Sequence, residues 1–300
     1  MRMAGAVDIG GTKVLAGIAD ETGKILASRS FPTVTGEGGA LQSTRAIAET
    51  LRDQCASLGL ALEALSGIGI VCAGPVNPVS GVVDNPYTLP GWGGFPITAN
   101  LWQMTGLRAK LENDANGVLL GEIKLNGLKN ERVLMLRFGS GIGVAFCHHG
   151  VLYRAGGVYH PEMGHMIVDS EGPACYCNHI GCFESLWSGA SINRRAVEMG
   201  YRDFDQLYQD WASGNPALTE FMRRAERQLA GGVWNLMSIV KPDTLILGGG
   251  LMTKYFDFAA EIIRRDLAGL DDFVEKYRVL KAGEQGESAL VGGASLIFDA

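Results

Sequence analysis

The sequence has 300 residues, of which 47% are hydrophobic and 19% are charged, and its formal net charge at pH 7 is −6. This length and apolar content are typical of one or two folded domains, for which two lobes around a cleft are a natural arrangement, and they exclude a disordered chain. The acidic balance, without a dense basic run, argues against nucleic acid and an anionic membrane surface as partners.

The N-terminal segment does not fit a signal peptide, because Asp8 interrupts the apolar residues that follow Arg2. The apolar run 67–76 is too short to span a bilayer. We therefore expect a cytoplasmic protein. In a reducing compartment the six cysteines are expected to be free thiols or metal ligands rather than disulfides.

The first half of the chain alternates strand and helix patterns. Short apolar runs predict strands, and apolar residues at helical spacing predict helices. In order these are strands over 4–7, 14–18 and 24–31, a helix over 41–58, a strand over 68–73, a loop over 77–96, a strand over 107–111 and a helix over 118–124. The first three strands are expected to pair antiparallel.

The opening pattern returns in the second half, where strands are predicted over 133–138, 144–147 and 151–154. Either two related lobes each present a glycine-rich hairpin to a shared ligand, or these are two ordinary hairpins in a chain with 42 glycines. The rest of the chain is a Cys/His-rich stretch over 160–185, helices to about residue 240, a strand over 243–247 and a helix over 288–297.

The first glycine-rich turn, residues 8–13, has groups that suit a triphosphate. Gly10 and Gly11 have no Cβ, so their N–H groups can approach phosphate oxygens closely. Thr12 adds a hydroxyl, Lys13 a positive charge and Asp8 an oxygen ligand for Mg²⁺. The spacing matches neither a P-loop nor a dinucleotide fingerprint. A tight hairpin turn would explain the same residues.

Two further glycine runs extend the predicted nucleotide site. Residues 139–143 could cradle the other side of the triphosphate, and 248–250 follow a predicted strand and suit close packing of adenine or ribose. Each run could equally be an ordinary turn. The candidate contacts are Gly139, Ser140, Gly141, Gly143, Gly248, Gly249 and Gly250.

Asp114 is the best candidate for a general base. It lies at the end of a predicted strand, where ligands tend to meet α/β sheets. Phosphoryl transfer to a hydroxyl needs a group that accepts the hydroxyl proton, and a carboxylate of ordinary pKa is adequate. A helix N-cap or an Asx turn would also explain an aspartate here, and both roles can coexist.

The sharpest cluster combines one histidine with three cysteines, a donor set that matches a closed tetrahedral zinc site. Its members are His165, Cys175, Cys177 and Cys182, with His179 or His160 as competitors for the histidine position. Reduced buried thiols are the alternative, and three of the six cysteines within eight residues favour the metal. Four protein ligands leave no open position, which argues against a zinc hydrolase.

A series of motifs runs along nearly the whole chain. These are Asp8-Ile-Gly-Gly-Thr-Lys13, Cys72-Ala-Gly-Pro-Val76, Leu89-Pro-Gly-Trp92, Glu112-Asn-Asp-Ala-Asn116, Gly139-Ser-Gly-Ile-Gly143, Glu162-Met-Gly-His165, the three clustered cysteines with Glu184, and Leu247-Gly-Gly-Gly250. In kind and order they resemble the ROK family of bacterial sugar kinases.

The resemblance implies an α/β protein with an actin/hexokinase-like ATPase fold, two lobes around a cleft, ATP with Mg²⁺, a structural zinc and a homodimer. It places the catalytic base at Asp114 and sugar hydroxyl contacts at Asn113, Glu162, His165 and Glu184. We expect a small lobe over 1–113, together with a C-terminal helix over 288–300, and a large lobe over 114–287 with the zinc loop.

Some positions depart from the family pattern. Asn178 stands where a glycine usually follows the second cysteine, and Arg137-Phe138 precede the second glycine turn where Thr-Leu is commoner. Thr88 replaces the usual asparagine before Leu89. None removes a proposed catalytic group, but Thr88 belongs to a loop expected to border the sugar and so bears on substrate identity.

The leading interpretation is an ATP-dependent kinase that converts glucose to glucose 6-phosphate. An N-acetylglucosamine or N-acetylmannosamine kinase would use the same machinery. A repressor of the family would carry a helix-turn-helix before the first glycine turn, for which the seven residues before Asp8 leave no room. Asp114 argues against a non-catalytic sugar-sensing regulator. The choice of sugar, and of ATP or polyphosphate as donor, is left open by the sequence.

Overall fold

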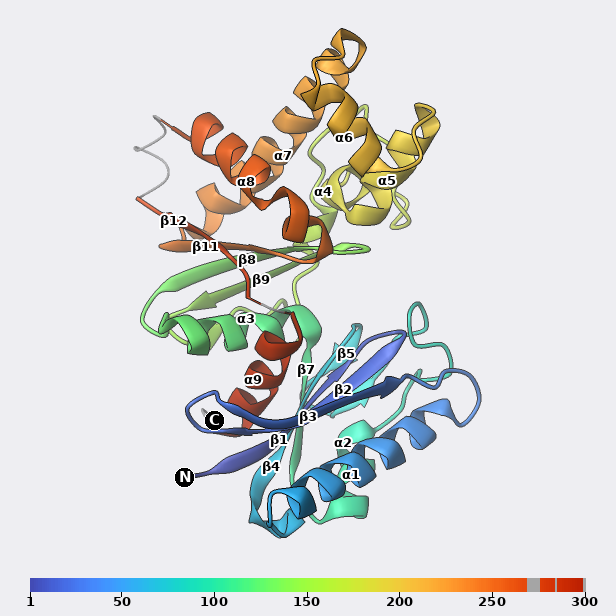
Figure 1. Cartoon of the computed structure of the whole chain (residues 1–300), viewed down its shortest axis with the longest axis vertical. Helices are drawn as coiled ribbons and strands as arrows, with labels where there is room; N and C mark the ends of the chain where they lie inside the picture. Colours follow the sequence, from blue (N-terminus) through green and yellow to red (C-terminus); the bar gives the residue numbers. More distant parts are fainter. Residues whose placement is uncertain (269–275, 284, 299–300) are drawn as a thin grey trace. The chain divides into compact units, whose positions relative to one another are not determined.

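The computed structural model describes residues 1–268, 276–283 and 285–298. The chain forms two compact units, and most of their helices and strands are labelled in Figure 1. Unit 1 contains residues 1–130, 147–161 and the segment from 283 onward, and unit 2 contains residues 131–146 and 162–282. The chain therefore passes from one unit to the other four times.

A mixed sheet with the strand order β3-β2-β1-β4-β7 forms the centre of unit 1. The three N-terminal strands pair antiparallel, as the sequence predicts, whereas β1, β4 and β7 run parallel. The strands of unit 1 are β1 (Met3–Ile9), β2 (Lys13–Asp20), β3 (Ile25–Pro32), β4 (Leu65–Cys72), the short β5 (Val76–Asn77) and β6 (Val82–Val83), β7 (Ala109–Asn113) and β10 (Val151–Leu152). Its helices are α1 (Gly39–Ser57), η1 (Leu62–Ala64), α2 (Ile97–Thr105), α3 (Asp114–Asn126) and α9 (Gln285–Phe298).

The two faces of this sheet are packed differently because side chains alternate along a strand. Val7 and Ile9 of β1 belong to a large apolar core together with residues of α1 such as Ile47 and Leu51. Ala4 and Ala6 point to the other face, where they meet Leu290, Ala294 and Ile297 of α9. The small alanines let α9 approach the strands closely.

Glycines bring α9 against the backbone of its neighbours. A Cβ atom at Gly69 of β4 would lie 1.7 Å from the carbonyl oxygen of Gly293, and one at Gly121 of α3 would lie 1.9 Å from that of Ser288. No side chain fits at either distance. This close packing explains why α3 groups with unit 1, although the sequence suggests a domain boundary after residue 113.

Unit 2 contains a second sheet in which β9, β8, β11 and β12 lie side by side in that order. β8, β11 and β12 run parallel, and β9 continues past residue 146 into an antiparallel hairpin with β10. The strands are β8 (Arg132–Phe138), β9 (Ile142–His148), β11 (Thr244–Gly248) and β12 (Arg278–Lys281). The helices are η2 (Met163–His165), α4 (Phe183–Trp187), α5 (Gly189–Glu198), α6 (Phe204–Ala212), η3 (Pro216–Leu218), α7 (Thr219–Val240) and α8 (Gly250–Asp266).

The core of unit 2 forms where α4, α7 and α8 cover this sheet. Phe138 of β8 and Leu247 of β11 are fully buried with Phe183 and Trp187 of α4. The indole N–H of Trp187 donates to the carbonyl oxygen of Ala225 in α7 at 2.7 Å, so the buried polar group has a partner.

Most predicted elements are present, and the α/β class is confirmed. The sequence-based interpretation omitted α2, α8 and β12, and the helix predicted over 118–124 begins earlier, at Asp114. The apolar run 67–76 lies in β4 and the turn after it. Among the residues that the structure describes, no helix is both long and apolar enough to cross a membrane.

The close contact between α3 and α9 can be tested by substituting alanine for glycine. Gly121→Ala would push a methyl group into the backbone of α9 and should destabilise the fold by about 1–3 kcal/mol, the usual cost of overpacking. The matched control is Gly231→Ala in α7, where the new Cβ would lie 3.5 Å from a methyl group of Val168, an ordinary contact. The control should stabilise by up to about 1 kcal/mol through helix propensity. Urea unfolding measures both, and equal midpoints would contradict the packing argument.

Candidate functional site

The carboxyl ends of three parallel strands meet at one edge of the sheet in unit 1. Ile9 of β1 is aligned with Cys72 of β4, and Cys72 is aligned with Asn113 of β7. Burial, followed by the negative charges of Asp114 and Asp8, raises the pKa of the Cys72 thiol. The two carboxylates that the sequence singled out therefore lie near the same thiol, at the edge where ligands bind α/β sheets.

Asp114 is the first residue of α3. The side-chain oxygen of Asn113 caps this helix by accepting from the N–H groups of Ala115, at 2.9 Å, and Asn116, at 3.4 Å. The Oδ1 atom of Asp114 accepts from the N–H of Ala115 at 2.9 Å. The N-terminal end of a helix favours a negative charge, so the ionised form of Asp114 suits this position.

Beneath this turn lies a polar network in which Glu112 is fully buried. Glu112 Oε1 accepts from the N–H of Asn113 at 2.8 Å and from the amide of Asn116 at 2.9 Å, and Oε2 pairs with Arg154. The sequence interpretation quoted Glu112 within a motif but gave it no role. A charged residue at the end of an apolar strand is the signal that could have indicated one.

His160 extends the network rather than joining the cysteines. Its Nδ1 atom lies 3.2 Å from Asn116 Oδ1. Because the amide nitrogen of Asn116 already donates to Glu112, its oxygen must accept, and His160 Nδ1 must carry the proton. Burial lowers the pKa of His160, while the charges of Asp114 and Glu112 oppose this shift. The sequence left His160 as a possible metal ligand, but in the structure it contacts Asn116 and is not part of the Cys/His cluster.

The first glycine turn is fastened to a loop of the same unit. A Cβ atom at Gly11 would lie 2.8 Å from the carbonyl oxygen of Thr88, so the turn requires glycine there. The buried Asn85 holds Thr88 by accepting from its N–H at 3.0 Å and donating to its hydroxyl at 2.7 Å. The departure from the family pattern at Thr88 is therefore accommodated by a specific contact.

In unit 2, the second glycine turn contacts Glu184. Glu184 Oε2 accepts from the N–H of Ile142 at 2.8 Å, and a Cβ atom at Gly141 would lie 2.5 Å from the same oxygen. The carbonyl oxygen of Gly139 accepts from the N–H of Gly189 at 2.7 Å. A residue predicted to contact sugar and a turn predicted to contact nucleotide are thus adjacent.

The third glycine run lies beside the second. β8 and β11 are parallel, and Gly248 is aligned with Arg137, so both turns follow the carboxyl ends of neighbouring strands. Gly249 has a φ of 88°, and a Cβ atom there would lie 2.5 Å from the carbonyl oxygen of Phe138. α8 begins at Gly250 and directs its first N–H groups to this edge, an arrangement that suits an anion.

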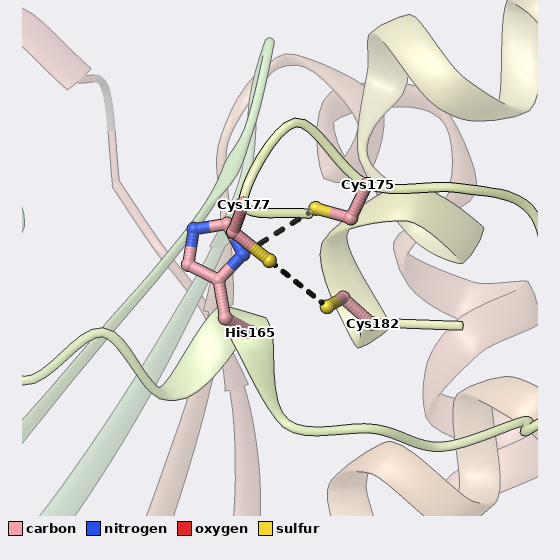
Figure 2. A group of neighbouring side chains, drawn as sticks. All are labelled: His165, Cys175, Cys177 and Cys182. Atoms are coloured by element: carbon pink, nitrogen blue, oxygen red, sulfur yellow. Dashed lines mark hydrogen bonds between the residues drawn. The ribbon is translucent and has the colours of Figure 1, made fainter. Parts of the chain in front are cut away.

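The predicted metal ligands converge on one point, as Figure 2 shows. The ligand atoms of His165, Cys175, Cys177 and Cys182 all lie within 4.8 Å of one another. His165 Nδ1 is 3.5 Å from Cys175 Sγ, and Cys177 Sγ is 3.5 Å from Cys182 Sγ. His179 lies at the margin, with Nδ1 3.7 Å from Cys177 Sγ.

The loop that carries these residues uses one backbone conformation rare for side chains larger than glycine. Asn178 has a φ of 68°, in the left-handed region that asparagine tolerates better than most residues. This accounts for an asparagine where the family pattern has glycine. Hydrogen bonds from the backbone and side chain of His179 lower the pKa of Cys177 to about 6, so this thiol readily provides a thiolate.

Tyr176, which the sequence interpretation did not mention, lies among the residues predicted to contact sugar. Its hydroxyl is 3.0 Å from His165 Nε2. Partial burial of the hydroxyl, and then the charge and hydrogen bond of Glu184, raise the pKa of Tyr176, with a further contribution from the charge of Glu162. Tyr176 thus links the three predicted sugar contacts of unit 2. Its position between Cys175 and Cys177 is the sequence feature that could have indicated this role.

A family model described as "ROK family" matches residues 4–300. The chain is 30% identical to the glucokinase of Thermotoga maritima over 97% of this chain and 96% of that protein, and 27% identical to an N-acetylmannosamine kinase of Escherichia coli over 97% and 99%. The ROK hexokinase structure from Thermus thermophilus has a TM-score of 0.84 at 28% identity, covering 99% of this chain and all of that one. A Streptomyces griseus ROK glucokinase in complex with glucose and AMPPNP has a TM-score of 0.73 at 27% identity, with the same coverage.

Proposed function

The chain belongs to the ROK family and is a sugar kinase with the actin/hexokinase-like fold, and we propose that it transfers the γ-phosphate of ATP to the 6-hydroxyl of glucose. The observation that carries this proposal is the arrangement at the sheet edge of unit 1. There Asp114 begins α3 directly after β7, and β4 lies between β7 and β1, the strand that ends in the Asp8 glycine turn, so that Asp114 and Asp8 both lie near the Cys72 thiol at the end of β4. A general base and a phosphate-binding turn on one edge suit phosphoryl transfer.

Asp114 is proposed as the base that accepts the proton of the attacking hydroxyl. The reaction needs the hydroxyl oxygen aligned with the γ-phosphorus, so the base must be held in place as well as ionised. The Asn113 cap and the buried Glu112 hold the first turn of α3, and the helix N-terminus favours the carboxylate. The retained base is also the reason to prefer an enzyme over a non-catalytic sugar-sensing regulator.

The glycine turns are proposed to hold the nucleotide. In unit 1, Gly11 and Thr12 offer N–H groups and a hydroxyl at the end of a strand, whereas the N–H of Gly10 already donates to the carbonyl oxygen of Lys13 at 3.0 Å, so that Gly10 would contribute through its lack of a side chain. Asp8 and Lys13 would hold a magnesium ion and a phosphate, and the metal would neutralise charge on the β- and γ-phosphates. In unit 2, residues 139–143 and 248–250 offer further backbone groups at a second sheet edge.

Sugar hydroxyls are proposed to contact Asn113, Glu162, His165 and Glu184. The amide and imidazole groups can donate to a hydroxyl or accept from one, and the carboxylates accept from one. Glu184 already accepts from the N–H of Ile142 with Oε2, which fixes its carboxylate before the sugar arrives.

Glucose is favoured over an N-acetylhexosamine by the motif from Leu89 to Trp92, which resembles the glucose-kinase members of the family. Both residues are fully buried, and the Trp92 indole N–H donates to the carbonyl oxygen of Val34 at 3.0 Å, so the motif acts by shaping the loop. The similarity to an N-acetylmannosamine kinase supports the alternative. A homodimer and a cytoplasmic location are proposed on family membership.

A structural zinc ion is proposed for the Cys/His cluster. In a tetrahedral site with Zn–S bonds of about 2.3 Å, neighbouring sulfur atoms are roughly 3.8 Å apart. The Sγ atoms of Cys177 and Cys182 are 3.5 Å apart, close to this value. His165 Nδ1 lies 3.5 Å from Cys175 Sγ, and a nitrogen–sulfur pair is expected to be slightly closer because the Zn–N bond, at about 2.0–2.1 Å, is shorter. His165, Cys175, Cys177 and Cys182 would hold the ion, which would fix the loop that carries Glu162 and Glu184 and supply no reaction step.

Asp114→Asn tests the base. Asparagine keeps the oxygen that accepts from the N–H of Ala115, so the fold and sugar binding should persist while kcat falls roughly 10²–10⁴-fold. A coupled ADP-release assay gives kcat, and calorimetry gives sugar affinity. Asp53→Asn, at an exposed ion pair with Arg29, is the control and should keep full activity. Near-normal turnover in the Asp114 variant would rule out its proposed role.

A panel of acceptors in the same assay tests the sugar. We expect kcat/KM to be highest for glucose, because the resemblance at Leu89 to Trp92 is to glucose kinases. N-acetylglucosamine and N-acetylmannosamine test the alternative, and inorganic polyphosphate in place of ATP tests the donor. A higher kcat/KM for either N-acetyl sugar would overturn the glucose assignment.

Metal analysis tests the zinc. Purified protein should contain about one zinc ion per chain. Cys177→Ser should lose the metal, lower the melting temperature and raise KM for sugar while leaving KM for ATP little changed, because the loop loses its anchor. Cys55→Ser is the control, since it changes a buried thiol outside the cluster and should retain the metal. Active protein without bound metal would refute the site.

A further inference from the structure

A cavity in unit 1 is lined by none of the residues proposed for catalysis or for substrate binding. Its volume is about 670 Å³. It is lined by β7, by the C-terminal half of α3 and the residues that follow this helix, by β10, and by the C-terminal turns of α9. Its volume is within the range of roughly 300–1,000 Å³ that small-molecule sites occupy. We call it the basic pocket after the charges that line it.

The basic pocket combines apolar walls with an excess of positive charge. Leucine and isoleucine side chains of α3, β10 and α9 form the walls, and Lys110, Lys124, Lys129 and Arg154 provide four cationic groups. The carboxylate of Glu112 is the only acid among these described lining residues, and it is buried against Arg154. The whole chain has a net charge of −6, whereas the residues around this cavity have a net positive charge.

The environment of Lys110 disfavours the positive charge of its ammonium group. Burial, and then the positive charge of the neighbouring Arg108, lower the pKa of Lys110. Each effect makes the ammonium group less favourable than in water, and the negative charge of an anion close to it would oppose both. A cavity with walls of low dielectric also concentrates the field of its charges on whatever enters.

We propose that the basic pocket is an effector site for a small organic anion that has an apolar body and a phosphate or carboxylate head group. The lysines recognise the head group, and the leucine and isoleucine walls recognise the body. A neutral ligand would form no ion pair with Lys110 or Lys124, whereas an inorganic anion would leave the apolar walls without contacts.

Arg154 connects the pocket to the proposed base. It lines the basic pocket and pairs with Glu112, whose other oxygen accepts from the Asn113 N–H and the Asn116 amide at the start of α3. An anion that attracts Arg154 weakens this pair and loosens the turn that holds Asp114. Occupancy is therefore expected to lower kcat, a consequence that rests on the proposed kinase activity.

Calorimetry without ATP or sugar tests binding independently of the reaction. The probes are hexyl phosphate and hexanoate, with inorganic phosphate and 1-hexanol as head-group and body controls. We expect one of the two amphiphilic anions to bind at one site per chain at least tenfold more tightly than either control. The stronger of the two identifies the head group.

Variants locate this binding. Lys110→Met with Lys124→Met removes two charges but keeps the apolar stems, and should weaken the preferred probe at least tenfold. Lys24→Met, at an exposed lysine of unit 1 outside the pocket, should leave binding unchanged. Absence of probe binding, or equal binding by the double variant, would overturn the proposal.

Kinetics at saturating ATP and sugar test the coupling. The preferred probe should lower kcat of the wild-type protein at least twofold under these conditions, where competition with either substrate is excluded. The double Lys→Met variant should resist it. Binding without any change in kcat would overturn the effector role, whereas failure of the kinase assay itself would count against the proposed function and leave the calorimetric result to stand.

Discussion

The buried carboxylate of Glu112 is the contact on which the proposed active centre of unit 1 depends. Removing a charge from water costs several kcal/mol unless it is paired and hydrogen-bonded. Glu112 satisfies both conditions with the guanidinium of Arg154, the backbone N–H of Asn113 and the amide of Asn116. Loss of one partner of such a pair typically costs about 3–5 kcal/mol. The first turn of α3, and with it Asp114, is therefore held by an interaction that is expensive to break.

In both units the carboxyl ends of neighbouring parallel strands lie at the same edge of the sheet. In unit 1 this arrangement aligns Ile9, Cys72 and Asn113, and in unit 2 it aligns Gly248 with Arg137. Glycine follows the ends of β1, β8 and β11, and at Gly249 it is required because the backbone turns against the carbonyl oxygen of Phe138. The glycine-rich motifs thus serve packing within each unit as well as the approach of a ligand.

The Cys/His loop is connected to the glycine turn of its own unit through Glu184. Cys182, one of the four clustered residues, is the N-cap of α4, and Glu184 on that helix accepts from the N–H of Ile142. Tyr176 closes the arrangement by contacting His165 and Glu184. A shift of the loop would move the residues proposed for sugar binding, which gives a structural metal an indirect part in substrate affinity.

The sequence by itself determined the features whose chemistry is local. The α/β pattern, the glycine turns, Asp114 after a strand and the one histidine with three cysteines over 165–182 were all predicted, because spacing and residue type carry that information. Other contacts join residues far apart in the chain, such as Glu112 with Arg154, Ile142 with Glu184, and Gly121 with Ser288. The basic pocket likewise draws on four separate segments. Only the tertiary structure decides these, because no periodicity or motif records which distant side chains will meet once the sheets and helices have packed.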